Sequence, residues 1–171
     1  MIINSYMFMH PEANHPAIRR PLPGALAAIA LSLTLLSTPA TACWEEAASY
    51  YGVSAHLLYA IAKTESGLNP RAINRSNKNG SYDIGLMQIN SRWLPMLRKH
   101  GIEEQQLYDP CTSIQVAAWI LADNMRRMGS TWEAVGAYNA RDAALRVKYA
   151  WKVYRNLDAA ALEGGDAAGG S

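Results

Sequence analysis

Apolar residues recur along most of this chain at the spacing of amphipathic α-helices. After Ser54, for example, Leu57, Leu58 and Ile61 share one helix face, because residues three and four positions apart lie one above the other. This periodicity, together with glycines and prolines that end the helical runs, predicts a mainly helical fold. The expected helices cover residues 44–51, 54–66, 93–100, 110–128, 130–139 and 143–154.

Capping residues support the start of three of these helices. Ser54 is a favourable N-cap. Asp109 before Pro110 combines an N-cap with a proline at the first helical position. Ser130 and Glu133 have the spacing of a capping box.

Residues 66–83 break the helical pattern. They are rich in Asn, Ser and Gly, which is typical of an irregular loop or a small hairpin. The next segment, "IGLMQIN" at 84–90, is too short to assign from periodicity. We therefore expect a single, mainly α domain in which β structure is limited to a minimal hairpin or loop region.

The first 42 residues have the features of a secretory signal peptide. Arg19 and Arg20 precede an apolar run at 22–36 that is too short to span a bilayer comfortably. Ala40 and Ala42 have the spacing of a cleavage signal, which predicts cleavage after Ala42; a retained membrane anchor is the alternative. The mature domain would cover residues 43–157, and residues 158–171, poor in apolar content, would form a disordered tail.

Charge and composition exclude several classes of function. The formal net charge is +2, and removal of Arg19, Arg20 and Glu12 with the leader leaves +1. This positive charge is too small to indicate binding of a polyanion such as nucleic acid. His56 and His100 are isolated and lack metal-ligand spacing. We expect no nucleic-acid partner, no metal and no cofactor.

The two cysteines, Cys43 and Cys111, have two interpretations. In an exported protein, an even pair favours a disulfide, and closing so long a loop would contribute on the order of 4 kcal/mol. However, Cys43 would also be the first residue after cleavage, where bacterial lipoproteins carry a lipidated cysteine. Lipidation at Cys43 would leave Cys111 without a partner, and we treat it as the alternative.

Glu65 is the first candidate for chemistry. It falls four residues after Ile61 and so lies on the apolar face, in the last turn of its helix. Desolvation and the negative end of the helix dipole both raise the pKa of a carboxyl there. A carboxyl protonated near neutral pH is a general acid, as glycosidic cleavage requires. The alternative is a solvated acid at a helix end.

The residues after Glu65 favour a glycan ligand. Residues 84–91 hold few charges, and Gln88 and Asn90 offer amide hydrogen bonds. All five tryptophans and eight of the nine tyrosines follow residue 42, and such rings stack on sugars. Trp119 and Trp151 are expected to serve packing, because aromatic residues at helical spacing are more often part of a core.

Four short motifs carry a family resemblance. "ES" at 65–66, "GLMQIN" at 85–90, "AYNA" at 137–140 and "YAWKV" at 149–153 resemble the family-1 lytic transglycosylases, over most of residues 43–155. The resemblance implies a lysozyme-like fold, cleavage of peptidoglycan and a periplasmic location, and we expect a monomer. The cysteine pair resembles the small exported members that accompany type III secretion, conjugation or type IV pilus machines.

The resemblance also implies a mechanism. Glu65 would protonate the oxygen between N-acetylmuramic acid and N-acetylglucosamine and then take a proton from the muramic C6 hydroxyl, which gives a 1,6-anhydro product without water. Tyr138 would hydrogen-bond and orient the acid, and Asn139 would line the groove. Further substrate contacts would come from Gln88, Asn90 and the backbone near Met87. Ser66 would hydrogen-bond the substrate or position the loop; the alternative is a simple helix-end residue.

Asp83 adds a second resemblance. "GSYDIGLMQINSRW" at 80–93 is similar to the loop of C-type lysozymes that carries their catalytic aspartate, and Asp83 occupies that place. Asp83 would then help catalysis electrostatically, or act with Glu65 in a true hydrolase that uses water. The other interpretation is a turn-capping aspartate. A further alternative is a non-catalytic module that binds peptidoglycan.

Overall fold

The structure, a computed structural model, describes the backbone of residues 40–165 and the side chains of residues 43–157. The predicted signal peptide up to residue 39 and the end of the predicted tail, from residue 166, lie outside the described residues. None of the described helices is both long enough and apolar enough to cross a membrane.

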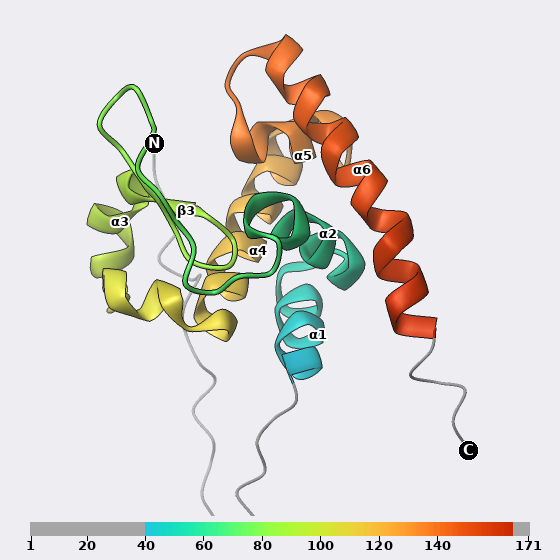
Figure 1. The fold of residues 1–171 in the computed structure, drawn as a ribbon, viewed down its shortest axis with the longest axis horizontal. Helices are drawn as coiled ribbons and strands as arrows, with labels where there is room; N and C mark the ends of the chain where they lie inside the picture. Colours follow the sequence, from blue (N-terminus) through green and yellow to red (C-terminus); the bar gives the residue numbers. More distant parts are fainter. Residues whose placement is uncertain (1–39, 166–171) are drawn as a thin grey trace, which may run out of the picture. The chain divides into compact units, whose positions relative to one another are not determined.

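The described residues form a mainly helical domain with a small sheet, as the sequence predicts (Figure 1). Two short 3₁₀ turns, η2 and η3, connect the sheet region to the long helices. The helical elements are α1 (Ala40–Tyr51), α2 (Ala55–Ser66), η2 (Ser91–Trp93), α3 (Leu94–Arg98), η3 (Glu104–Tyr108), α4 (Pro110–Met128), α5 (Trp132–Asn139) and α6 (Ala143–Gly165).

Two of the predicted caps are confirmed. The Ser54 hydroxyl accepts a hydrogen bond from the Leu57 amide at the start of α2, and the Asp109 carboxylate accepts one from the Thr112 amide at the start of α4. Each bond satisfies one of the amides that a first helical turn leaves unpaired. Gly67 then ends α2 in the left-handed conformation, with φ of 61°.

The third predicted cap was wrong by one residue. Thr131, not Ser130, is the N-cap of α5, and its hydroxyl accepts a hydrogen bond from the Ala134 amide. Glu133 forms no capping box; its carboxylate pairs with the Arg146 guanidinium at 3.0 Å. An ion pair across two helices therefore replaces the expected local contact.

Helix α6 is longer than predicted. It continues to Gly165, past the expected end at Tyr154 and into residues 158–165, where a disordered tail was predicted. The segment is rich in Ala with Leu and Glu, which are strong helix formers. Extending an existing helix avoids the cost of nucleation, which favours continuation of α6 through such a segment.

Three strands of two residues form the β region: β1 (Ile73–Asn74), β2 (Asp83–Ile84) and β3 (Ile89–Asn90). They pair antiparallel in the order β1-β2-β3, and Asp83 lies opposite both Asn74 and Asn90. The segment that periodicity could not assign is thus a strand, a tight turn and a second strand. This register brings the Asp83 side chain beside two asparagines.

Gly85 occupies the turn between β2 and β3 with φ of 74°, as expected for an unusual backbone angle. A Cβ atom at this position would lie 2.1 Å from the carbonyl oxygen of Leu107. The close neighbour of Gly85 is therefore the backbone of η3. Only glycine fits this position.

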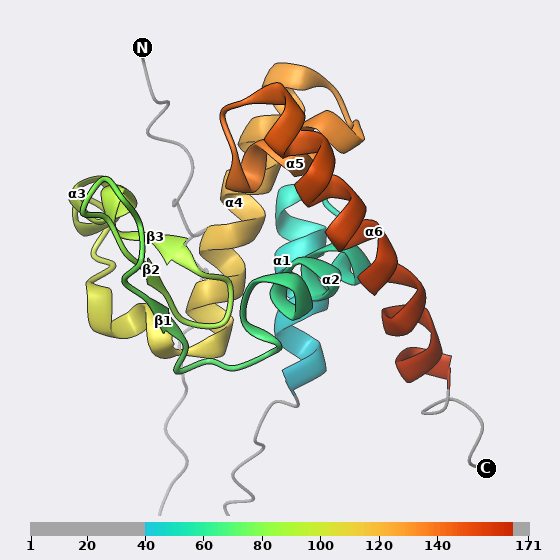
Figure 2. The ribbon, with the colours of Figure 1, turned by 45° about the horizontal axis from the view of Figure 1, so that its top comes forward.

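Helix α4 lies between the two halves of the domain. Figure 2 shows the strands and α3 on one side of α4, with α1, α2 and α6 on the other. Helix α6 packs on α2 and α5. The predicted disulfide is confirmed: Cys43 of α1 is bonded to Cys111 in the first turn of α4. Because that bond uses the Cys43 thiol, it disfavours lipidation there.

The two tryptophans that were assigned to packing differ. Trp119 is buried and meets Trp93 edge to face, with ring centroids 5.2 Å apart. Trp151 is 58% exposed, so its assignment to the core was wrong. Together with Trp132 and Tyr154 it lines an apolar cavity of about 640 Å³ between α5 and α6.

Candidate active site

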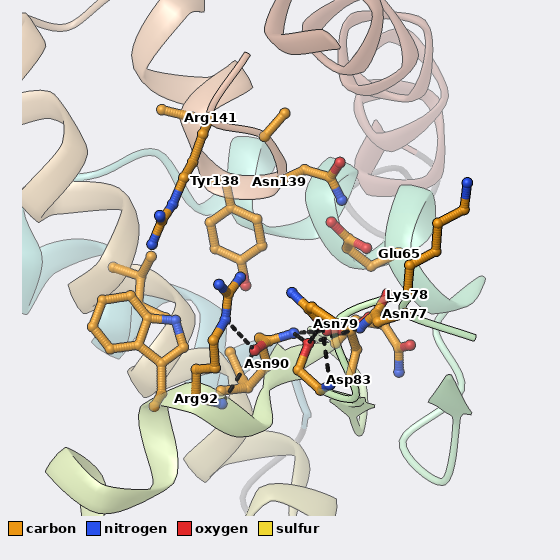
Figure 3. Close-up of a pocket in the computed structure, with 17 residues that line it drawn as sticks. Glu65, Asn77, Lys78, Asn79, Asp83, Asn90, Arg92, Tyr138, Asn139 and Arg141 are labelled. Carbon is orange, nitrogen blue, oxygen red and sulfur yellow. Dashed lines mark hydrogen bonds between the residues drawn. The ribbon is translucent and has the colours of Figure 1, made fainter. Parts of the chain in front are cut away.

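A polar cleft of about 640 Å³ receives side chains from both sides of α4 (Figure 3). Its two carboxylates are Glu65 and Asp83, so the structure brings both candidate catalytic residues to one cavity. The lining residues are Glu65, Asn77, Lys78, Asn79, Ser81, Asp83, Gln88, Ile89, Asn90, Arg92, Trp93, Ile120, Ala137, Tyr138, Asn139, Ala140 and Arg141.

Glu65 projects into the cleft from the last turn of α2. Burial is the main cause that raises its pKa, from 4.5 to about 7, and the charge of Asp83 acts in the same direction. Hydrogen bonds from Tyr149 and Asn139 and the charge of Lys152 oppose this shift but do not cancel it. The carboxyl can therefore hold or release a proton near neutral pH.

The tyrosine that orients Glu65 is Tyr149, and the assignment of that role to Tyr138 was wrong. The Tyr149 hydroxyl donates to Glu65 Oε1 at 2.6 Å. The Tyr138 hydroxyl instead donates to the Met87 carbonyl at 3.0 Å. Burial holds the pKa of Tyr149 well above its usual value, so its hydroxyl remains a donor.

Tyr149 had a signal in the sequence. It is the first residue of "YAWKV", one of the four motifs of the resemblance. However, 84 positions separate it from Glu65, and only the packing of α6 on α2 brings the two together. No local pattern distinguishes Tyr149 from the other tyrosines as the partner of the acid.

Asp83 is held by three asparagine side chains. Asn90 Nδ2 donates to Oδ1 at 2.6 Å, and Asn77 and Asn74 donate to Oδ2 at 2.9 and 3.1 Å. All three bonds are donated to the carboxyl group, as for a carboxylate, which only accepts. None comes from a turn amide, so this geometry favours a positioned charge over a turn cap.

Ser66 lies beside the cleft and stabilises its wall. Its hydroxyl donates to the Leu86 carbonyl at 2.6 Å and accepts from the Asn69 amide at 3.1 Å. It is absent from the cleft lining. The hydroxyl therefore ties the end of α2 to the turn between β2 and β3, in agreement with the loop-positioning role that the sequence left open.

Met87 does not face the cleft, so its predicted contact with sugar was wrong. Its side chain is fully buried. Its amide donates to the Ser113 hydroxyl at 3.2 Å, and its carbonyl accepts from Tyr138. Both backbone groups of Met87 are thus hydrogen-bonded within the protein, and its amide has no further hydrogen to donate to a ligand.

The other predicted contact residues, Gln88, Asn90, Tyr138 and Asn139, all line the cleft. Gln88 has φ of 49°, and its amide nitrogen donates to the carbonyls of Ala72 and Gly85. This arrangement leaves the amide oxygen of Gln88 available to a ligand. Among the described residues, no group of three or more His, Cys, Asp or Glu is placed to hold a metal ion.

A family model described as "Transglycosylase SLT domain" matches residues 42–156. The chain belongs to this family. The SLT family membership makes the chain a peptidoglycan lytic transglycosylase, in agreement with an acid held in a polar cleft.

Two known proteins and a solved structure are similar to this chain. Invasion protein IagB of Salmonella typhimurium is 45% identical over 133 residues, which cover 75% of this chain and 82% of IagB. Protein IpgF of Shigella flexneri is 45% identical over 118 residues, which cover 66% and 77%. Lytic transglycosylase Slt from Pseudomonas aeruginosa, solved as an inactive mutant, matches with a TM-score of 0.58 at 21% identity, covering 72% of this chain and 24% of Slt. The last likeness confirms the lysozyme-like fold.

Proposed function

We propose that this SLT-domain chain cleaves the β-1,4 bond between N-acetylmuramic acid and N-acetylglucosamine and leaves 1,6-anhydromuramic acid ends. The observation that carries the proposal is a single carboxyl, Glu65, whose pKa of about 7 suits both a proton donor and a proton acceptor. In a transglycosylase one group can fill both roles, because the proton that it donates to the leaving oxygen is replaced by the proton of the C6 hydroxyl.

In the first step, protonated Glu65 donates its proton to the glycosidic oxygen as the bond to C1 breaks. C1 then carries oxocarbenium-like positive charge, or the N-acetyl group closes on it as an oxazolinium. In the second step, the ionised Glu65 takes the proton of the C6 hydroxyl, whose oxygen bonds to C1. The Tyr149 hydroxyl, 2.6 Å from Oε1, positions the carboxyl throughout.

Asp83 supplies fixed negative charge to the same cleft. Its three asparagine donors hold the carboxylate in place, so it needs no rearrangement as positive charge develops at C1. Its charge is also felt by Glu65, whose pKa it raises. We propose an electrostatic role for Asp83, with Gln88, Asn90, Tyr138 and Asn139 forming the walls that contact the sugars.

The same two carboxylates support a second candidate, a lysozyme-type hydrolase. In that case Asp83 would stabilise the intermediate or attack it, and water would complete the reaction. The asparagine cage around Asp83 is the observation that favours this candidate. Product analysis distinguishes the two, because a transglycosylase yields anhydro ends and a hydrolase yields reducing ends.

The deciding experiment is mass spectrometry of peptidoglycan sacculi digested by the purified domain. Anhydromuropeptides are expected from the wild-type chain and none from Glu65→Gln. Release of reducing ends alone would replace the transglycosylase by the hydrolase. Full activity in the Glu65→Gln variant would remove Glu65 from catalysis, and sacculi bound but left uncut by the wild type would favour a binding module.

We further propose that the chain acts in the periplasm after removal of residues 1–42 and opens the wall locally for a secretion or pilus apparatus. The name of the Salmonella relative, an invasion protein, supports a link to host entry. Fractionation of cells with an antibody to the domain tests the location. Loss of secretion in a Glu65→Gln strain, with the apparatus subunits still produced, tests the role.

A further inference from the structure

Three cations line the active-site cleft: Lys78, Arg92 and Arg141. The salt bridges of the described residues all involve other cations. The two acids of the cleft are occupied, since Glu65 accepts from Tyr149 and Asp83 from three asparagines. The cleft therefore presents positive charge that its own carboxylates do not pair.

Arg92 is held in place by Asn90. The Asn90 side-chain oxygen accepts from the Arg92 backbone amide and from its Nε, both at 3.1 Å. The same Asn90 amide donates to Asp83, so one asparagine positions both the carboxylate and the guanidinium. The two terminal nitrogens of Arg92 remain available as a fork that fits a carboxylate.

Arg141 reaches the cleft from the opposite wall. It lies in the loop between α5 and α6, and Figure 3 shows Arg92 and Arg141 extending into the cleft from opposite walls, near Tyr138. In the view of Figure 3, Lys78 is drawn toward the end of the cleft where Glu65 lies. Two guanidinium groups thus gather at one end of the cleft, apart from the reacting acid.

In a strand whose muramic acids all carry peptides, the sugars give these arginines nothing to pair with. N-acetylglucosamine is neutral, and the lactyl group of N-acetylmuramic acid is neutral once a peptide is attached to it. The free carboxylates of peptidoglycan belong to the stem peptides. We propose that Arg92 and Arg141 form a subsite for a stem-peptide carboxylate, so that the enzyme prefers strands whose stem peptides carry free carboxylates; this inference rests on the proposed peptidoglycan cleavage.

The test compares two substrates: sacculi with free stem-peptide carboxylates, and the same sacculi after carbodiimide coupling to ammonia has converted those carboxylates to neutral amides. For the Arg92→Gln/Arg141→Gln variant, we expect kcat/KM to fall more than tenfold on the untreated sacculi and to change less than twofold on the amidated ones. Lys78→Gln is the matched control, because it removes one charge from the other end of the cleft. The wild-type preference should also weaken with added salt.

Equal losses on both substrates, or no loss on either, would overturn the subsite. A second measurement is independent of turnover: calorimetric binding of soluble peptide-bearing fragments to the Glu65→Gln variant, with and without the two arginine substitutions. Equal affinities would also overturn the subsite. A wild-type chain that binds these fragments through its arginines but cleaves neither substrate would instead contradict the proposed function.

Discussion

The hydrogen bond from Tyr149 to Glu65 gives a prediction with an internal control. Tyr149→Phe removes the hydroxyl that lies 2.6 Å from Glu65 Oε1 and keeps the buried ring. A hydrogen bond to a charged group is worth about 1.5–3 kcal/mol, which corresponds to a roughly 10- to 100-fold loss of rate if the bond positions the ionised acid in the transition state.

The pH profile shows which state of Glu65 the bond supports. The Tyr149 bond lowers the pKa of Glu65 against the larger effect of burial. Its removal should therefore raise that pKa above about 7 and move the alkaline limb of kcat/KM, where the acid loses its proton, to higher pH. The rate on purified sacculi is measured from about pH 5 to pH 9.

Tyr138→Phe is the matched control. It removes the hydroxyl that donates to the Met87 carbonyl at 3.0 Å. That hydrogen bond does not involve an acid. We expect a loss of stability in thermal unfolding and an unmoved alkaline limb. An unchanged rate and profile in Tyr149→Phe, or the same displacement in both variants, would refute the assignment of Tyr149 as the residue that positions the acid.

Three further predictions concern charge and cross-linking. Burial raises the pKa of Glu65 from 4.5 to about 7, so the free energy of unfolding falls as pH rises through this range. Denaturant titrations should therefore show that Glu65→Gln stabilises the domain above pH 7 by at most about 3 kcal/mol. Below pH 4, where Glu65 is protonated in both states, the substitution should give no such gain. Asp83→Asn should lower activity partially while the domain stays folded, and an unaltered rate would make Asp83 structural only. Replacing Cys43 and Cys111 by Ala should lower the free energy of unfolding by about 2–4 kcal/mol and leave the alkaline limb of the pH profile of kcat/KM unmoved. Urea unfolding of the wild type and the variant measures the loss of stability.

Local patterns predicted the helical framework well, because capping and amphipathicity act within a few residues. The side chains of Ser54 and Asp109 accept hydrogen bonds from amides in the first turns of α2 and α4, and Gly67 ends α2. These roles do not depend on distant packing. The wrong prediction of the α5 cap has an equally local cause. Thr131 and Ser130 are both good caps, and the choice between them depends on where the chain enters α5.

The β region and the tail were less predictable. Strands of two residues are too short to show a period, and the sheet depends on pairing between segments. In the tail, low apolar content predicted disorder, but the helix propensity of its alanines continues α6 to Gly165. The exposure of Trp151 was missed because a helical pattern shows which residues share a face but not which faces the rest of the fold covers.

What the sequence determined by itself is the presence of an acid on an apolar helix face, a second acid in a loop, and the motifs of a family. What only the tertiary structure decided is which groups meet. Tyr149 and not Tyr138 reaches Glu65, three asparagines surround Asp83, and Arg92 and Arg141 share one end of the cleft. Helix caps and amphipathic faces depend on residues within one or two turns, whereas these contacts depend on how α6 and the sheet pack around α2 and α4, which no short stretch of sequence specifies.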